Sequence, residues 1–320
     1  MALCFLLHVA ALALSKYSIE DGVIYASYTS TCYSIFASYS VLQQERYWDI
    51  LRQTRSLVGV LQQASREVDK EMDQSHRGAA RIGVGQAFAA AVVFVGLAID
   101  AAVHDRYFTP LWPLIPLAGD WGRYAASASS NFTVVIGAIA FSAVVNAVLT
   151  VSGVLAGMHR VLAARLEALA HPDEVAEVVR LHRHVRRLTL ELSDFFAGNL
   201  VHLMCCTFVN SVIATLQVLA NDVSGTTFGM ILSLAISFAP LAYASQEVSD
   251  ASLALSTAAY HAATSGLVTL GEARALLMLM RVADSTPALR CRGVGRLSLP
   301  GAGHTVSQYY SVIQTLRNKV

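Results

Sequence analysis

The chain has 320 residues, of which 55% are hydrophobic and only 14% are charged. Ordinary soluble domains carry about 25% charged residues, so this composition excludes that class and favours a membrane protein. The formal net charge of +1 gives no electrostatic reason to expect a nucleic-acid partner.

Apolar segments follow one another along most of the chain. Residues 1–15 are too short for a spanning helix of about 20 residues, but they lack a positive n-region and contain His8, which favours half of a first membrane helix over a signal peptide. Clearer spans follow at 23–42, 83–103, 132–157, 195–220 and 227–244. With a last helix at 298–317, the sequence predicts an all-α polytopic membrane protein, a bundle of seven transmembrane helices.

The distribution of charge orients these spans. Four connections separate the clear spans, at 43–82, 104–131, 158–194 and 221–226. The first and third are rich in arginine, whereas the second and fourth contain only Arg106 and Arg123 as basic residues. Because Arg and Lys mark the cytoplasmic side, we expect a cytoplasmic N-terminus and an extracellular C-terminus. This polarity is opposite to that of a G-protein-coupled receptor.

Neither the cysteines nor the histidines are spaced like metal ligands. The cysteines are Cys4, Cys32, Cys205, Cys206 and Cys291. Their spacing fits no metal site or disulfide framework, so we expect small buried apolar residues. In the basic run at 182–187, His182 and His184 are two residues apart and point in different directions on a helix, so we do not expect them to bind one metal ion together. We expect this run to form a face that contacts water or lipid headgroups.

The connection at 104–131 is aromatic and stiffened by prolines, with Trp112 and Trp121 among its residues. It fits two functions equally, a lid over a ligand pocket or an aromatic belt at the outer membrane interface. At its end, Asn131 begins an Asn-Phe-Thr glycosylation sequon, predicted on the outer side against the membrane edge.

The C-terminal region contains the most distinctive pattern. From Gln246 the chain has Q-E-V-x-D-x-S-x-x-L-x-x-A-A-Y, followed by R-A-L-L-M-L-M-R ending at Arg281, then L-S-L, and then Y-S followed by L-R. The last helix places hydroxyl and amide groups among Val306, Val312 and Leu316. A membrane helix of this kind usually packs against protein or faces a water-filled path.

In this order and spacing, the pattern resembles the C-terminal signature of insect odorant receptors. A second block, LHRHVRRLTLELSDFFAGNLVHLMCCTFVNSVIATLQV at 181–218, is similar to the segment that enters the family's fifth helix. The resemblance implies a ligand-gated, non-selective cation channel in the plasma membrane of an olfactory neuron dendrite. It also implies a tetramer with the odorant receptor co-receptor, a small volatile apolar ligand, surrounding membrane lipid, no cofactor and no enzymatic activity.

The resemblance divides the chain into two parts. Residues 1–244 would form a ligand-binding bundle of six helices, the first of them partial, with cytoplasmic helix extensions at 43–82 and 158–194. Residues 245–320 would form a cytoplasmic anchor helix, which contacts other subunits, and the seventh helix, which lines the pore.

An odorant pocket must be mostly apolar with a few polar groups. In the family it lies among the outer halves of the second, third, fourth and sixth helices. The matching positions are Tyr25, Tyr28, Thr29, Phe94, Ala98, Phe132, Ile136, Met230 and Ser233. Tyr25, Tyr28 and Thr29 share one helix face. For each of these residues, ordinary helix packing is the competing explanation.

The last helix spans about 28 Å at 1.5 Å per residue, which is enough to cross the hydrocarbon. The pore and gate positions implied by the resemblance are Val306, Gln308, Tyr310, Ile313 and Leu316. Around a symmetry axis, Ile313 and Leu316 would form an apolar ring that gates by dewetting, and Gln308 would help to hydrate ions. The competing explanation is a lipid-facing span.

Several alternatives stay open. A gustatory-type channel of the same superfamily lacks support because the T-Y-x-x-x-x-x-Q-F ending is missing. A truncated, non-conducting paralogue fits the short N-terminus and Ser245, which stands where the family commonly has glycine. A transporter or membrane enzyme is less favoured because the sequence has no HExxH, no paired intramembrane carboxylates, no phosphate loop and no broken-helix repeat.

Overall fold

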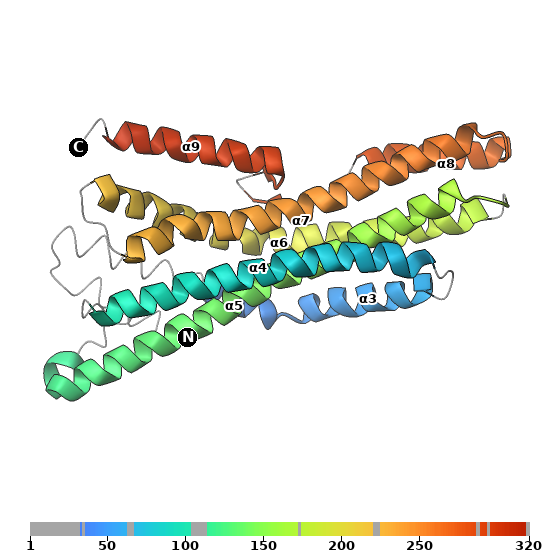
Figure 1. Cartoon of the computed structure of the whole chain (residues 1–320). Coiled ribbons are helices and arrows are strands. Elements are labelled where there is room, and N and C mark those ends of the chain that lie inside the picture. Colours follow the sequence, from blue (N-terminus) through green and yellow to red (C-terminus); the bar gives the residue numbers. More distant parts are fainter. Residues whose placement is uncertain are drawn as a thin grey trace.

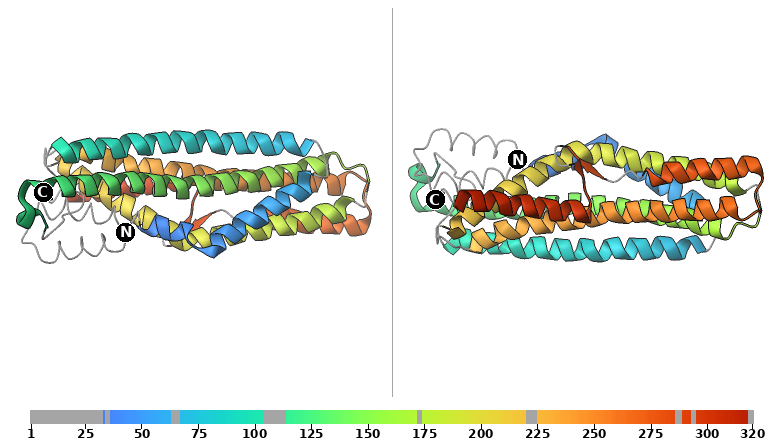
Figure 2. Two further views of the ribbon diagram at one scale, coloured as in Figure 1. Left: turned by 90° about the horizontal axis from the view of Figure 1, so that it is seen from below. Right: turned by 90° about the horizontal axis from the view of Figure 1, so that it is seen from above.

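The computed structural model describes Tyr33 and residues 36–62, 67–103, 114–171, 174–219, 225–285, 289–292 and 295–317. Long helices lie side by side in an elongated bundle (Figures 1 and 2), which confirms the all-α prediction. In chain order the elements are α3 (Glu45–Gln62), α4 (Glu67–Val103), α5 (Leu114–Glu167), α6 (Glu174–Leu219), α7 (Gly225–Thr264), α8 (Leu270–Asp284), β1 (Arg290–Cys291), β2 (Gly295–Arg296) and α9 (Leu299–Arg317).

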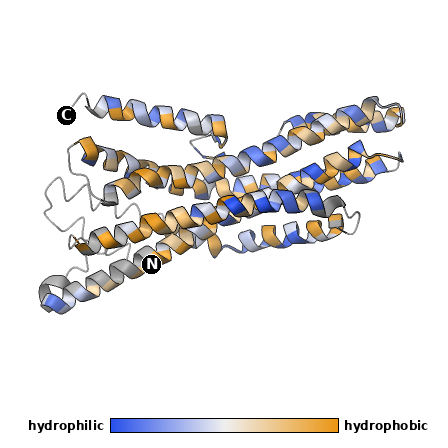
Figure 3. Ribbon diagram, in the orientation of Figure 1, coloured by the Kyte–Doolittle hydropathy of each residue, from blue (hydrophilic) through white to orange (hydrophobic). Residues whose placement is uncertain are grey.

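Four of these helices are much longer than a bilayer is thick. The helices α4, α5, α6 and α7 contain 37, 54, 46 and 40 residues. At 1.5 Å per residue they measure about 55 to 80 Å, against a hydrocarbon core of about 30 Å. Their apolar stretches lie together toward one end of the bundle and most charged stretches toward the other (Figure 3). The 158–194 segment is therefore mostly a helical continuation of α5 and α6, whereas the 43–82 segment contains the separate helix α3 and the first part of α4.

Within the described residues, four segments are long and apolar enough to cross a membrane. They are Met72–Gly96, Val135–Glu167, Glu174–Leu219 and Thr227–Thr264. They overlap the spans predicted at 83–103, 132–157, 195–220 and 227–244. The predicted half-span at 1–15 and most of the span at 23–42 lie outside the described residues. The last predicted span is the helix α9, although α9 is not among these four segments.

The connection at 104–131 is more helical than predicted. Helix α5 already begins at Leu114, with one non-helical residue, Gly119, at φ 54° and ψ −130°. Beyond Trp121 the sequence is rich in Ala and Ser and has no proline, so nothing ends the helix before the span. Asn131 of the sequon consequently lies inside α5, while residues 104–113 are outside the described part of the chain.

Helices α4 and α5 approach closely where α5 has no side chain. A Cβ added at Gly153 would lie 2.7 Å from the Cβ of Ala79, and one at Gly157 would lie 3.3 Å from the Cα of Met72. Small residues permit such backbone contact between membrane helices. The Ala- and Gly-rich span of α5 therefore packs closely against α4.

The region after α7 folds back along the bundle. A turn with Gly266 at φ +76° leads to α8, whose first turn is capped by Thr269. The Thr269 side chain accepts a hydrogen bond from the Glu272 N–H, and the Glu272 carboxylate accepts one from the Thr269 N–H at 2.7 Å. This reciprocal arrangement satisfies two backbone donors and fixes where α8 begins.

Buried serines attach the short hairpin of β1 and β2 to the bundle. The N–H of Leu289 donates to Ser245 Oγ at 3.0 Å, and the N–H of Arg290 donates to Ser193 Oγ at 3.2 Å. Ser245, which stands where the odorant receptor family commonly has glycine, thus has a structural role. A glycine there would offer no side-chain acceptor to the Leu289 N–H.

The expectation for the cysteines holds at two of the three described positions. Cys206 and Cys291 are buried, and burial, followed by the effect of nearby Cys205, raises the pKa of the Cys291 thiol to about 11. Cys291 is therefore an inert packing residue at neutral pH. Cys205 instead lies exposed on α6.

The basic run at 182–187 is only partly solvated. Arg183, His184 and Arg187 are exposed as predicted, but His182 is only 3% exposed. Its ring lies 5.8 Å, centroid to centroid, from the ring of His159 on α5. His182 is thus part of the α5–α6 packing and not of the solvated face.

Candidate functional site

One face of α4 carries exposed apolar side chains at helical spacing. They are Val84, Phe88, Val92, Val95, Ile99 and Val103, which are between 55% and 72% exposed. A contiguous apolar surface of this length requires lipid or another protein to cover it. The same stripe continues toward the N-terminus with Arg77 and Arg81, which are charged and exposed. The boundary of the hydrocarbon on α4 therefore lies between Arg81 and Val84.

Four of the predicted ligand-binding residues lie at least partly inside the apolar part of the bundle. The ring of Phe94 on α4 lies 6.4 Å from the ring of Phe141 on α5, and Ile136 on α5 is half-buried. On α7, Met230 is buried and the half-buried Ser233 donates its O–H to the Met230 carbonyl at 2.6 Å. The structure thus places two of these residues on the α4–α5 pair and two on α7.

Among the other predicted ligand-binding residues, Phe132 alone has a described side chain, and it does not lie in this interior. Phe132 is 67% exposed and lies on an outward stripe of α5 with Val135 and Ile139. Ala98 lies on α4, but its side chain is outside the described part. Tyr25, Tyr28 and Thr29 precede the described residues.

The chemistry of the inward-facing residues suits an uncharged ligand. Phe94 and Phe141 offer aromatic surface, Met230 offers a thioether and Ser233 a hydroxyl. The Ser233 hydroxyl is already satisfied by its own helix, so it adds little to a polar contact. Such a surface would hold a ligand mainly through apolar burial.

Helix α9 is held against the bundle by Tyr309, which the sequence did not single out. The Tyr309 O–H donates to the Ser211 carbonyl of α6 at 2.9 Å and also contacts the Thr215 hydroxyl. The Tyr309 ring meets Phe208 edge-on, with centroids 5.9 Å apart. Phe208, Ser211 and Thr215 lie on one face of α6 because they are three and four residues apart. That spacing is the only feature of the sequence that could have indicated the contact with Tyr309.

The predicted pore residues lie on different sides of α9. Val306 and Tyr310 are 59% and 61% exposed, and the exposed Gln308 lies 3.1 Å from the His304 ring nitrogen. Ile313 is half-buried on the side of Tyr309, one turn further along the helix. The Leu316 side chain is outside the described part.

The exposed side of α9 is largely polar. It carries His304, Ser307, Gln308, Ser311, Gln314 and Thr315. Figure 2 shows α9 lying along the outside of the bundle beside α7 and α6, so this polar side is directed away from the helices of its own subunit. A helix that is half polar on its free side fits contact with water or protein better than contact with lipid.

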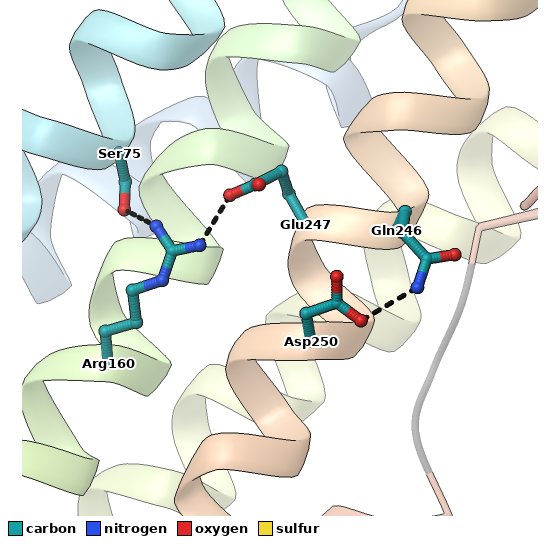
Figure 4. A network of polar contacts seen from close by, with 5 residues as sticks. All are labelled: Ser75, Arg160, Gln246, Glu247 and Asp250. Carbon is teal, nitrogen blue, oxygen red and sulfur yellow. Dashed lines mark hydrogen bonds and ion pairs between the residues drawn. The ribbon is translucent and has the colours of Figure 1, made fainter. Parts of the chain in front are cut away.

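A polar network joins three helices (Figure 4), and its Arg160 and Glu247 follow shortly after the apolar stretches of α5 and α7 in the sequence. Arg160 of α5 donates to Ser75 Oγ of α4 and to Glu247 Oε2 of α7, each at 2.6 Å. The Arg160 and Glu247 side chains are 28% and 25% exposed. Nearby on α7, Gln246 donates to Asp250 at 2.8 Å. The network fixes α4, α5 and α7 relative to one another.

Replacing Glu247 by Ala should lower the free energy of unfolding by about 1–2 kcal/mol, because the Arg160 guanidinium would lose its carboxylate. Partial exposure keeps this below the 3–5 kcal/mol of a fully buried pair. Thermal melts of the single variants and the double variant R160A/E247A measure the coupling. The matched control is Arg52→Ala, whose pair with Asp49 is 75% and 53% exposed. Additive losses in the double variant would contradict the interaction.

Comparisons with known proteins agree with this arrangement. Residues 22–265, more than half of the chain, match the model of a family described as 7tm Odorant receptor. Among solved structures, the insect olfactory receptor OR5 from Machilis hrabei matches with a TM-score of 0.77 and 11% identity, covering 99% of this chain and 85% of that one. The same receptor in complex with eugenol matches with a TM-score of 0.74 and 13% identity, covering 98% and 86%. The search of curated proteins gave no match.

Proposed function

The chain belongs to the insect odorant receptor family, and we propose that it is a subunit of an odorant-gated, non-selective cation channel formed with the odorant receptor co-receptor. The subunit would lie in the plasma membrane of an olfactory neuron dendrite, with a cytoplasmic N-terminus and an extracellular C-terminus. The excess of arginine in the 43–82 and 158–194 segments supports this orientation.

The single observation that carries the channel proposal is the polar free side of α9. A helix attached to its bundle through Tyr309 while exposing hydroxyl, amide and imidazole groups is suited to line an aqueous path. Four such helices around a symmetry axis would enclose the path. Val306, Gln308 and Tyr310 are exposed on α9, and they remain our proposed pore residues, with Ile313 and Leu316 as the apolar gate.

Exposed apolar side chains on α8 support assembly with other subunits. Leu270 and Met278 are 72% and 71% exposed, and Leu277 is 42% exposed. Helix α8 has 15 residues, which is short for a membrane span of about 20, and the resemblance assigns it to the cytoplasmic anchor, so we expect protein to cover these residues. Apolar side chains of this size outside the membrane are typical of a protein interface.

The proposed ligand is a small, volatile, apolar molecule that binds among the inner helices and shifts a closed–open equilibrium. Such a shift requires tighter binding to the open state. The solved relative in complex with eugenol supports this class of ligand. Phe94, Met230, Ser233 and Ile136 are the described residues that we place at the ligand. The site would be completed by Tyr25, Tyr28, Thr29 and Ala98, whereas Phe132, although also predicted, faces away from it.

The test is current recording from cells that express this chain with the co-receptor, over a panel of apolar volatiles that includes eugenol. We expect a cation current that requires both the chain and a volatile. Phe94→Ala should raise the half-maximal concentration about tenfold, equivalent to about 1.4 kcal/mol of lost contact. Val92→Ala, which removes a side chain from the outward stripe of α4, should leave that concentration unchanged.

The other outcomes separate the alternatives. Absence of current despite surface delivery would indicate a non-conducting paralogue. Responses confined to water-soluble tastants would favour a gustatory-type channel, and uptake of a solute without any odorant would favour a transporter.

A further inference from the structure

Two cavities adjoin one another between α4 and α7, and both are lined by Tyr243. The first has a volume of about 730 Å³ and is polar and basic, with Lys70, Arg77 and Arg81 from α4 among its lining residues. The second has a volume of about 510 Å³ and is apolar, with Ile236 of α7 in its wall. Together they form one groove whose chemistry changes along the helix axis.

The groove crosses the boundary of the hydrocarbon. On α4 that boundary lies between Arg81 and Val84. The polar network of Arg160 and Glu247 lies in the wall of the basic cavity, near the level where the apolar stretches of α5 and α7 end. The basic cavity therefore lies at the level of lipid headgroups, and the apolar cavity lies at the level of acyl chains.

The basic cavity has positive charge that its own carboxylates do not neutralise. Asp73 pairs with Arg77, and Glu247 pairs with Arg160. Among the described residues, no carboxylate forms an ion pair with Lys70 or Arg81. Arg81 lies at the membrane boundary, and Lys70 lies about 16.5 Å further from the hydrocarbon along α4. Both cations attract an anion and most strongly a phosphate, to which arginine donates in a fixed fork.

A buried amide lies just inside the hydrocarbon boundary. Gln86 lines the apolar cavity and is only 4% exposed. Its Oε1 accepts from Asn146 Nδ2 at 3.2 Å, but its Nε2 has no hydrogen-bond partner among the described residues. A buried donor without an acceptor is unfavourable by about 1–3 kcal/mol, so an oxygen that reached this group would be held strongly. Along α4, Gln86 lies about 7.5 Å beyond Arg81.

We propose that this groove binds one anionic phospholipid of the surrounding membrane. Its phosphate would lie at Arg81 with Arg77 beside it, and Lys70 would attract it from the far end of the basic cavity. A glycerol ester carbonyl would accept from Gln86 Nε2. One acyl chain would follow Ala89 and Ala239 between α4 and α7. The order of anion, ester and hydrocarbon in a phospholipid matches the order of the groups along the groove.

Lipid in this groove would brace α4 against α7 beside the Arg160 network and so stabilise the bundle. The site is separate from the inward-facing residues that we assign to the odorant. Its test therefore does not depend on whether the chain conducts ions.

The experiment measures the melting temperature of the full-length protein, purified with its co-receptor in a neutral detergent, during titration with dioctanoyl phosphatidic acid. Dioctanoyl phosphatidylcholine controls for the tail, and glycerol 3-phosphate controls for the headgroup alone. We expect a saturable rise in melting temperature with phosphatidic acid only. Equal stabilisation by phosphatidylcholine would overturn the anionic site, and full stabilisation by glycerol 3-phosphate would overturn the lipid site.

Variants separate the two halves of the groove. Arg81→Gln should weaken the apparent affinity for phosphatidic acid about tenfold, the loss expected for a charge-assisted hydrogen bond. Arg183→Gln, which removes an exposed arginine of α6 outside the groove, should leave the affinity unchanged. Ala239→Phe should fill the apolar cavity and weaken binding, whereas Val92→Phe on the outward stripe of α4 should not. Melts without lipid establish that each variant is folded. Equal effects of the arginine variants or of the phenylalanine variants would refute the proposal.

Discussion

A leucine at Gly153 is expected to prevent α4 and α5 from packing and to remove most folded receptor from the cell surface. A Cβ at this position would already lie 2.7 Å from the Ala79 Cβ and 3.4 Å from the Ser75 carbonyl. The rest of a leucine side chain has no free space between two backbones, so the helices must separate. Overpacking of this kind costs about 1–3 kcal/mol and occasionally more, and we expect the upper end because the Cβ of Ala79 is fixed to its backbone and cannot rotate away. Thermal melts and surface labelling measure the effect.

Gly198 on α6 supplies the matched control. A Cβ at Gly198 would meet no heavy atom within 4 Å, and alanine is favoured over glycine inside a helix by about 0.5–1 kcal/mol. Gly198→Ala should therefore preserve or raise the melting temperature, whereas Gly153→Ala should lower it and Gly153→Leu should lower it further. A Gly153→Leu receptor that melts like the unaltered protein would show that the α4–α5 contact is not tight.

The membrane spans were predictable because bilayer thickness sets a fixed length of apolar sequence. Helix ends were less predictable, since charged residues such as those around Arg160 continue a helix as readily as they form a loop. The segment from Trp121 to Asn131 shows the same difficulty, because it leaves the apolar window but contains no residue that stops a helix. Polarity marks where the membrane ends, and it does not mark where the helix ends.

Side-chain positions were harder to predict because they depend on how each helix is rotated about its axis. Phe94 and Phe132 are the same residue type in neighbouring spans, yet one packs on Phe141 and the other is 67% exposed. No sequence pattern relates Arg160 to Glu247, which are 87 residues apart, or Tyr309 to Ser211, which are 98 residues apart. Contacts at such separation are decided by the packing of whole helices.

Replacing Tyr309 by alanine should release α9 from α6. The variant loses the hydrogen bond to the Ser211 carbonyl, the contact with the Thr215 hydroxyl and the edge-on contact with Phe208. Two hydrogen bonds of about 1 kcal/mol each and an aromatic pair of about 0.5–1.5 kcal/mol together stabilise the docked helix by about 2.5–3.5 kcal/mol. We therefore expect hydrogen exchange in α9 to accelerate roughly 60- to 350-fold. Tyr309→Phe keeps the ring but loses the hydroxyl, so its rate of hydrogen exchange in α9 should lie between those of the unaltered protein and Tyr309→Ala.

The neighbouring Tyr310 separates attachment of α9 from its proposed role at the pore. Tyr310 is 61% exposed, so Tyr310→Ala removes few contacts within the subunit and should leave hydrogen exchange in α9 nearly unchanged. If the free side of α9 lines the ion path, the same variant should alter conductance, whereas Tyr309→Ala should reduce odorant-evoked current because the whole helix is no longer positioned. Equal acceleration of exchange by the two variants would mean that Tyr309 does not hold α9. An unchanged conductance in Tyr310→Ala would separate that residue from the pore, because a side chain of this size in an ion path affects permeation directly.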